Sequence, residues 1–317
     1  MYNFKENQSG YSILNNDTGE VIASVNGSDG LVISSGKEQE KRKDYFKKQE
    51  DNEKKEALKK QELDELGNFI WSTYHLKQII DPKEMRLSNI TRLMYLATYL
   101  DYNGYLMEDI PFSQKSPLNN TSIRAIMNLS KGAFSNFYNQ VLCNEKIFKI
   151  KYGKYKINEE LFRKGALNSF DIARMTKENE YIMRVYISGV REMYIKATPS
   201  SHKTLSYLFQ IIPYVNRQYN IVCYNPLETD LKKIMPMTLG GFSRILGYDE
   251  THSSRLFSVL FEPMFTTEYG TQSAVRYVAT KSTAKKTYNI FINPRVYYAG
   301  DNWKEVEILG AFNWGGW

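Results

Sequence analysis

The chain has 317 residues, of which 42% are hydrophobic, and its formal net charge is +7. This length predicts two domains with an appendage, and the positive charge favours an anionic partner such as nucleic acid. No segment approaches the roughly 18 apolar residues that a membrane span needs, so we expect no membrane partner. The amino terminus lacks an apolar leader segment, which leads us to expect a cytoplasmic protein.

The chain contains only two cysteines, Cys143 and Cys223, and three histidines. Neither cysteine has a second Cys or a His at zinc-ligand spacing, and the acidic residues form no compact cluster in the sequence. We therefore expect no metal ion and no cofactor. Cys143 ends an apolar helix face and Cys223 lies in an apolar strand, so both are predicted to be buried.

Residues 1–36 are predicted to form a small β-hairpin region. Two apolar runs, 11–14 and 20–25, flank the turn 15–19, and a further apolar run at 31–33 predicts another strand. Residues 37–66 are predicted to form one charged helix, because 37–65 holds ten basic and ten acidic residues without Gly or Pro. Its apolar residues keep no heptad, so a solvated connecting helix is favoured over a weak dimerising coiled coil, which remains an alternative.

Residues 67–161 are predicted to form the first of two similar domains. Residues 67–80 are expected to form a packed helix, followed by a helix over 87–101 and a short strand at 105–107. A third helix is expected to begin at a cap, Asn120 or Thr121. The turn 129–132 precedes a helix from 133 to about 144, whose apolar residues form one stripe. The opposite face of that helix is polar and carries Ser135, Asn136, Asn139 and Gln140.

A lysine-rich hairpin is predicted over 147–157. Lys149 and Lys151 alternate along its first strand and so share a face, and the turn and second strand add Lys154 and Lys156. Lysines on a short ribbon suit contact with phosphates. The alternative is an edge strand that its lysines protect against aggregation. Lys131, in the turn before the polar helix, adds a further positive charge.

Residues 162–202 are predicted to form a connector, in which 170–177 and 185–194 look helical or partly extended. Residues 203–317 are predicted to form the second domain with a C-terminal tail. We expect a helix over 204–215, a strand at 220–224, a helix capped by Thr238, a turn at 247–249, a further helix, and a hairpin over 273–292. The last helix has a polar face with Thr251, His252, Ser254, Arg255 and Ser258. The hairpin repeats the basic chemistry of the first domain with Arg276, Lys281, Lys285 and Lys286.

The order helix, strand, helix, turn, helix and hairpin is typical of a winged helix-turn-helix domain, which presents a helix to the major groove and a basic hairpin to phosphates. The sequence thus predicts an α+β, mainly helical fold with two winged helix-turn-helix domains, an N-terminal β-hairpin and a charged helix. Double-stranded DNA is the predicted partner. Asn side chains can bond adenine edges, and Arg255 is the best candidate for contact with guanine or phosphate. The predicted DNA-binding residues are Lys131, Ser135, Asn136, Asn139, Lys149, Lys151, Lys154, Lys156, Thr251, Ser254, Arg255, Arg276, Lys281, Lys285 and Lys286.

Two segments resemble known catalytic motifs, but neither matches its motif closely enough to predict an enzyme or a catalytic residue. Residues 30–37 differ from a phosphate-binding loop, because five residues instead of that motif's four separate Gly30 and Gly36. His252 and Arg255 have the spacing seen in tyrosine recombinases, with Tyr288 downstream. However, that pair falls on the predicted DNA-contacting helix, and Tyr288 falls on the core face of a predicted strand.

Five segments, 89–103, 129–139, 237–239, 245–249 and 292–300, resemble Firmicute plasmid and phage replication proteins of the winged-helix type, including the RepL class. The similarity spans about 89–160 and 203–310, and the last segment is similar to the family's Asn-Pro-aromatic-Gly tail. The resemblance implies sequence-specific DNA binding without enzymatic activity, and host replication proteins as partners. A phage transcription regulator with host transcription proteins as partners, a protein-interaction module that inhibits a host complex, and a homodimer remain open alternatives.

Overall fold

The computed structural model of the chain describes residues 2–7, 10–15, 18, 20–26, 34–73, 75–81, 83–109, 116–165, 182–260, 262–267, 270–280, 287–300, 302–310 and 312. Contacts divide the chain into two units, Met1–Glu62 and Leu63–Trp317. The strand predicted at 31–33 and the connector segment predicted at 170–177 lie outside the described residues. Within the described ranges, every helix is too short or too polar to cross a membrane.

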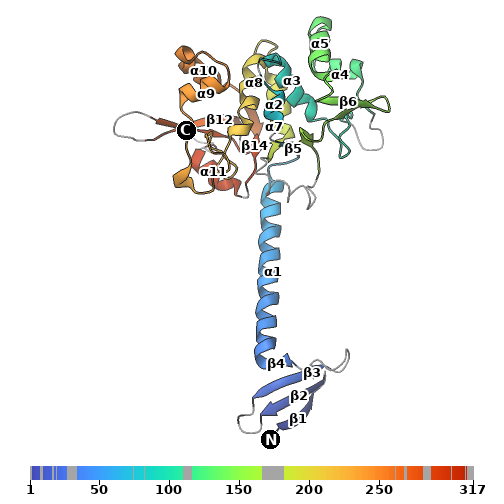
Figure 1. The fold of residues 1–317 in the computed structure, drawn as a ribbon, viewed down its shortest axis with the longest axis vertical. Helices are drawn as coiled ribbons and strands as arrows, with labels where there is room; N and C mark the ends of the chain where they lie inside the picture. The colour runs from blue at the N-terminus through green and yellow to red at the C-terminus, as the bar shows by residue number, and fades with distance from the viewer. Residues whose placement is uncertain are drawn as a thin grey trace. The chain divides into compact units, whose positions relative to one another are not determined.

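The first unit contains a four-stranded antiparallel sheet with the strand order β1-β2-β3-β4 (Figure 1). Its strands are β1 (Tyr2–Asn7), β2 (Gly10–Asn15), β3 (Val21–Asn26) and β4 (Ser34–Ser35). The predicted hairpin is confirmed, because β2 pairs with β3. The charged segment forms helix α1 (Gly36–Asp64), in which Lys54 Nζ lies 2.7 Å from Glu50 Oε1. Tyr45 and Phe46 of α1 are exposed, as expected of a solvated helix.

The second unit is α+β, with helices and small antiparallel sheets (Figure 1). One sheet has four strands in the order β14-β9-β5-β8. These strands are β5 (Phe69–Thr73), β8 (Phe162–Arg163), β9 (Ile182–Tyr186) and β14 (Tyr297–Tyr298). Segments far apart in the sequence therefore meet in one layer. Residues 69–163 are called the first half of this unit, and residues 182–298 the second half.

The prediction of a packed helix over 67–80 is wrong. β5 occupies much of that segment, and only α2 (Leu76–Ile79) is helical. Ile70 and Ser72 are fully buried while Phe69 and Trp71 are half-buried, which is the alternation of a strand. β5 pairs with β9, which comes much later in the chain. A local pattern of apolar residues does not reveal such a distant partner.

In the first half, three further helices follow α2 and precede a hairpin. The helices are α3 (Leu87–Ala97), α4 (Asn120–Ile126) and α5 (Lys131–Phe137), which continues into the π-helical turn η2 (Tyr138–Leu142). The hairpin consists of β6 (Phe148–Lys151) and β7 (Lys154–Ile157). Asn119 caps α4 by accepting two backbone hydrogen bonds, one residue earlier than the predicted cap, and Ser130 caps α5.

The second half repeats this order with additions. Its helices are α7 (Ile187–Lys196), α8 (His202–Gln210), α9 (Leu239–Ile245) and α10 (Ser253–Leu260), with 3-10 turns η3 (Ile212–Tyr214), η4 (Leu231–Lys233) and η5 (Glu250–His252). Two hairpins follow, β10 (Met264–Thr267) with β11 (Gly270–Ser273), and β12 (Val275–Thr280) with β13 (Thr287–Ile292). Helix α11 (Trp303–Gly310) comes after β14. Thr238 caps α9 as predicted, because its Oγ1 accepts a hydrogen bond from the Gly241 backbone.

The loop after α3 in the first half and the loop after α8 and η3 in the second half are built alike. Asp101 follows α3 and Asn216 follows η3, and the side-chain oxygen of each accepts a hydrogen bond from the backbone nitrogen two residues later. Gly104 and Asn220 come next, with positive φ angles of 78° and 52°. The carbonyl of each accepts a hydrogen bond from the last residue of the hairpin, β7 or β13. Each loop is therefore joined to the hairpin of its own half.

The turns farther along the chain also match. Asn128 after α4 and Gly247 after α9 have positive φ angles of 50° and 62°, and Gly247 begins the turn predicted at 247–249. Asn158 after β7 and Asn293 after β13 each accept a side-chain hydrogen bond from the backbone two residues later. Counting from Asn128 and Gly247 aligns the helices that follow these two turns, so that α5 corresponds to residues 250–256.

One apolar core joins the two halves. Helix α3 packs against α8, and both lie in the middle of the unit in Figure 1. Tyr194 of α7 stacks between Tyr95 of α3, with ring centroids 3.9 Å apart, and His202 of α8, at 4.3 Å. Buried residues from both halves belong to a single cluster, among them Leu93, Phe137, Leu208 and Leu256. The halves are therefore expected to fold as one body.

Candidate nucleic-acid interface

The β6–β7 hairpin gathers its four lysines on one face. In its register Lys149 lies opposite Lys156, and Lys151 lies opposite Lys154. Directly opposed residues of an antiparallel pair point to the same side of the ribbon. Lys149, Lys151 and Lys154 are exposed. The sequence predicted that Lys149 and Lys151 share a face, but not that both lysines of β7 join them there.

Lys156 differs from the other three lysines. Its Nζ lies 2.6 Å from Glu159 Oε1 and over the ring of Tyr105, and its side chain is only 28% exposed. The hydrogen bond that Lys156 Nζ donates to the Glu159 carboxylate raises the pKa of Lys156. Lys149, Lys151 and Lys154 therefore form the exposed basic face, and Lys156 lies at its inner end.

Two large apolar side chains also project from this hairpin. Tyr152, in the turn, is 84% exposed with a φ of 53°, and Ile150 of β6 is 67% exposed. Neither side chain is among the residues that the sequence predicted to contact DNA. The signal was available, because a tyrosine before Gly153 in a two-residue hairpin turn has no strand partner against which to pack.

The exposed stripe of α5 and η2 consists of Lys131, Ser135 and Asn139. These residues are four positions apart, so they follow one side of the helix. Phe137 and Val141, on the other side, are fully buried in the core. The stripe carries one positive charge and two polar groups that can both donate and accept hydrogen bonds.

Asn136 and Gln140 point toward the body of the protein. Asn89 Nδ2 of α3 donates hydrogen bonds to Asn136 Oδ1 at 3.0 Å and to Gln140 Oε1 at 2.7 Å. Asn89 Oδ1 in turn accepts a hydrogen bond from Arg92 Nη1 at 2.7 Å. The carbonyl oxygen of Asn136 is thus engaged within the protein, which leaves its NH₂ group as the part that could meet a base. The sequence pattern did not show this network.

Arg92 is an unusual residue for a helix core, because only 7% of it is exposed. Burial lowers the pKa of its guanidinium, and the neighbouring Tyr194 acts in the opposite direction. A buried charge is costly unless its donors are engaged, and Arg92 Nη1 is engaged by Asn89 while Arg92 Nε has no partner among the described residues. The chain of hydrogen bonds from Arg92 through Asn89 to Asn136 and Gln140 therefore fixes the orientation of α5 relative to α3.

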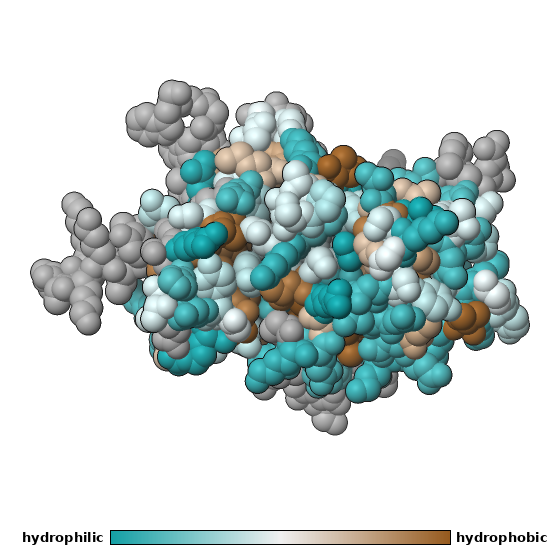
Figure 2. All heavy atoms as spheres, turned by 90° about the horizontal axis from the view of Figure 1, so that it is seen from above, coloured by the Kyte–Doolittle hydropathy of each residue, from teal (hydrophilic) through white to brown (hydrophobic). Residues whose placement is uncertain are grey.

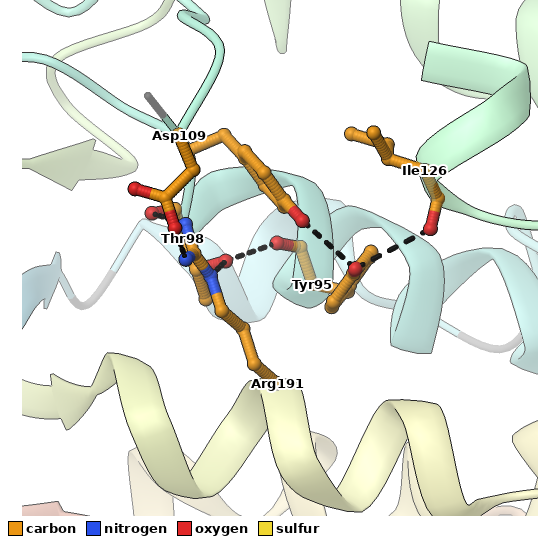
Figure 3. Close-up of polar contacts among 6 residues, drawn as sticks. Tyr95, Thr98, Asp109, Ile126 and Arg191 are labelled. Carbon is orange, nitrogen blue, oxygen red and sulfur yellow. Dashed lines mark hydrogen bonds and ion pairs between the residues drawn. The ribbon is translucent and has the colours of Figure 1, made fainter. Parts of the chain in front are cut away.

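Further contacts position α4. Tyr95 of α3 donates a hydrogen bond at 3.3 Å to the carbonyl of Ile126, the last residue of α4 (Figure 3). Figure 3 also shows Arg191 of α7, whose Nε donates to Thr98 Oγ1 at 2.9 Å and whose Nη1 forms an ion pair with Asp109. These bonds join α3, α4 and α7 and so support the turn that leads into α5.

The second half presents a different set of residues. Arg255 is exposed on α10, and Arg276 is exposed on β12 opposite Phe291. Ser258 lies on the predicted polar face of α10 and is also exposed, although it was not among the predicted DNA-binding residues. The side chain of Ser254 and residues 281–286, which hold Lys281, Lys285 and Lys286, lie outside what the structure describes.

The start of the helical segment before α10 is acidic. Asp249 Oδ1 accepts hydrogen bonds from the Thr251 backbone at 2.9 Å and from the Thr251 hydroxyl at 2.7 Å. These hydrogen bonds lower the pKa of Asp249, so its carboxylate stays charged. Asp249 thus caps the start of η5, and the Thr251 hydroxyl already donates its hydrogen bond to this carboxylate. A carboxylate at this place would repel a phosphate, whereas Ser130 at the equivalent position of the first half is neutral.

One face of the second unit is mainly hydrophilic. Figure 2 views the face at the top of Figure 1, and hydrophilic residues predominate there with hydrophobic ones scattered among them. Figure 1 draws α5 and α10 toward this face. A polar surface with few apolar patches suits a charged and hydrated partner.

The cysteines behave differently from each other. Cys223 is buried as predicted, and burial raises the pKa of its thiol to about 11. Cys143 is exposed, so the prediction of its burial is wrong. The π-helical turn η2 precedes it and shifts the helical periodicity on which that prediction relied. Among the described residues, His, Cys, Asp and Glu form no group of three that could hold a metal ion.

Comparison with known proteins adds no further assignment. No protein-family model, curated protein or solved structure matches this chain.

Proposed function

We propose that this chain is a sequence-specific protein that binds double-stranded DNA through two winged helix-turn-helix domains and acts in the replication initiation of a phage or plasmid. Each half supplies the required order: a helix, a short bridged segment, two helices separated by a tight turn, and a hairpin. α5 and α10 would enter the major groove, and the two hairpins would contact the backbone.

The lysine face of the β6–β7 hairpin carries the proposal. Two like-charged pairs, Lys149 with Lys156 and Lys151 with Lys154, stand directly opposite each other. Such pairs destabilise a ribbon, and only Lys156 has a carboxylate partner among the described residues. A phosphate backbone would neutralise the remaining three charges and release counterions. Residues 63–317 hold 31 of the 42 basic and 23 of the 35 acidic residues, so the positive excess lies in the second unit.

The replication role rests on the resemblance of the helix and tail segments to Firmicute plasmid and phage initiators, with host replication proteins as further partners. A phage transcription regulator would use the same DNA contacts. Mapping the bound sites separates these two roles. Repeated sites near an origin support replication, and a single promoter operator supports regulation.

A protein-interaction module is the second candidate, and two observations favour it. Ile150 and Tyr152 expose apolar surface at the hairpin, and Asp249 places a negative charge where DNA would approach the second half. Such a module would bind its partner without the steep salt dependence that phosphate contacts produce.

The test is the salt dependence of binding to random-sequence duplex DNA. The variant Lys149→Ala/Lys151→Ala/Lys154→Ala should bind every sequence more weakly and reduce the slope of log affinity against log salt by about 2.7, at about 0.9 for each phosphate contact. The control Lys232→Ala/Lys233→Ala/Lys304→Ala removes the same charge from exposed lysines elsewhere and should keep the slope. Binding that stays flat from about 50 to 200 mM salt, or equal slopes for the two variants, would refute the proposal.

A further inference from the structure

The four-stranded sheet shows how the two halves are related. Phe162 of β8 and Tyr297 of β14 are equivalent, because each lies four residues after the matching turn asparagine of its half. Phe162 pairs with Ser72 of β5, and Tyr297 pairs with Val185 of β9. Ser72 and Val185 therefore occupy equivalent positions, and the rest of β5 and β9 align at the same offset.

β5 and β9 also pair with each other, at the centre of the sheet. Trp71 lies opposite Arg184, and Arg184 is the residue of the second half that is equivalent to Trp71. The guanidinium carbon of Arg184 is 4.9 Å from the centroid of the Trp71 ring. The pairs on either side are reciprocal: Ile70 with Val185 and Ser72 with Met183. Contacts that recur with the two partners exchanged are the mark of a two-fold axis. A local two-fold axis thus passes through the Trp71–Arg184 pair.

The helices follow the same symmetry. α3 and α8 are equivalent and pack on each other, and β8 and β14 occupy the two outer edges of the sheet. In Figure 1, α4 and α5 lie on one flank of the central helices, and α9 and α10 lie on the other. Both helix pairs reach the same end of the second unit. The β6–β7 and β12–β13 hairpins extend in opposite directions. One chain thus has the arrangement of a two-fold dimer.

The surfaces that the symmetry relates are chemically different. The matching turns at Asn128 and Gly247 align Lys131 with Glu250, Asn136 with Arg255, and Asn139 with Ser258. The buried positions agree with this alignment, because Phe137 matches Leu256, and both are fully buried. The two helices therefore share a scaffold but would not favour the same bases.

We infer that one chain binds one duplex site made of two unlike half-sites in inverted orientation. This inference rests on the proposed function. The strands of a duplex are related by two-fold axes, so a protein whose two reading helices are related by a two-fold axis meets half-sites of opposite direction. Two domains related by translation would instead meet direct repeats. The differences between α5 and α10 make the two half-sites unequal.

The experiment is selection of bound sequences from a random duplex pool with the full chain. We expect two different short motifs in inverted orientation, with centres about 10 base pairs apart or a multiple of that. Direct repeats, a single motif, or a perfect palindrome shared by two copies would overturn this inference and leave DNA binding intact. No enrichment, together with salt-independent binding to random duplex, would overturn the proposed function as well.

A variant of the second half tests which helix contacts which half-site. Glu250→Lys/Arg255→Asn gives the second half the residues of the first at these positions and should shift one motif toward the other, while the other stays unchanged. The same chemical changes at exposed positions elsewhere, Glu53→Lys/Arg217→Asn, should leave both motifs as they are. A change in both motifs, or in neither, would contradict the assignment of one helix to each half-site.

Discussion

The two halves of the second unit have the same backbone plan and different surfaces. Both use an Asx turn after the equivalent helices α3 and α8, a positive φ before the bridged segment, and a second Asx turn after the hairpin. The first half carries its exposed basic face on a short ribbon and holds α5 through a buried Asn89–Arg92 network. The second half has an extra hairpin, β10–β11, and an acidic start to its exposed helix. Backbone hydrogen bonds thus preserve the plan while exposed side chains diverge.

The largest expected effect is a loss of unfolding free energy in two core variants, which tests whether the two halves fold as one body. Phe137→Ala and Leu256→Ala remove equivalent, fully buried side chains and should each cost about 2–5 kcal/mol of unfolding free energy. All four tryptophans lie in residues 63–317, so their fluorescence follows this unit alone. Both variants should lower the midpoint of the same denaturant transition. Two transitions, each shifted by one variant only, would show that the halves fold separately.

The next effect concerns the polar network around Asn89 in the first half, which has no counterpart among the described residues of the second half. Asn89→Ala leaves Asn136, Gln140 and Arg92 without their shared partner and should cost about 1–3 kcal/mol of unfolding free energy. Thr204 occupies the equivalent position of α8, and no hydrogen bond of its side chain is seen among the described residues. Thr204→Ala is therefore the matched control and should cost less. Equal losses in denaturant unfolding would mean that the network contributes nothing beyond packing.

A smaller, pH-dependent effect belongs to the second half. Burial lowers the pKa of His202 below its ordinary value of 6.5. As the pH falls below about 6.5, the unfolded chain takes up this proton before the folded chain does, so stability is lost on acidification and regained as the pH rises. One proton limits the slope to about 1.4 kcal/mol per pH unit.

The variant for this test is His202→Leu, which places the residue of the equivalent position Leu87 at this site. It should flatten the fall in unfolding free energy between pH 7 and the folded pKa of His202. His252→Leu, at an exposed histidine, is the control. If His202→Leu and the unaltered chain lose stability in parallel on acidification, another group is responsible.

The smallest expected effect concerns the like-charged lysine pairs of the β6–β7 hairpin. Lys154→Glu places a carboxylate opposite Lys151 and should stabilise the ribbon by about 0.2–1 kcal/mol at low salt while weakening DNA binding. Lys154→Gln is the control, because it removes the repulsion between residue 154 and Lys151 without adding an attraction. A gain in both stability and DNA affinity would show that the lysine face does not contact phosphate.

Much of the local structure could be predicted from the sequence. The β2–β3 hairpin, the charged helix α1, the Thr238 cap and the Gly247 turn follow from short-range preferences that a few neighbouring residues express. The polar stripe with Ser135 and Asn139 was likewise visible from helical periodicity. These features depend on backbone geometry within about one or two turns of chain.

Features that depend on distant partners could not be predicted. β5 is a strand because β9 pairs with it, and Asn136 turns inward because Asn89 of another helix meets it. A polar residue on a helix has the same periodicity whether it faces water or a buried amide. The exposure of Cys143 was missed for a related reason, because η2 departs from the α-helical period.

The shared sheet has a consequence for any attempt to divide the protein. β5 is flanked by β8 of its own half and by β9 of the other. A backbone cut within residues 166–181 would therefore produce two fragments, each with an unpaired strand edge and an uncovered face of α3 or α8. Such fragments should recombine when mixed, and neither should be soluble when expressed without the other.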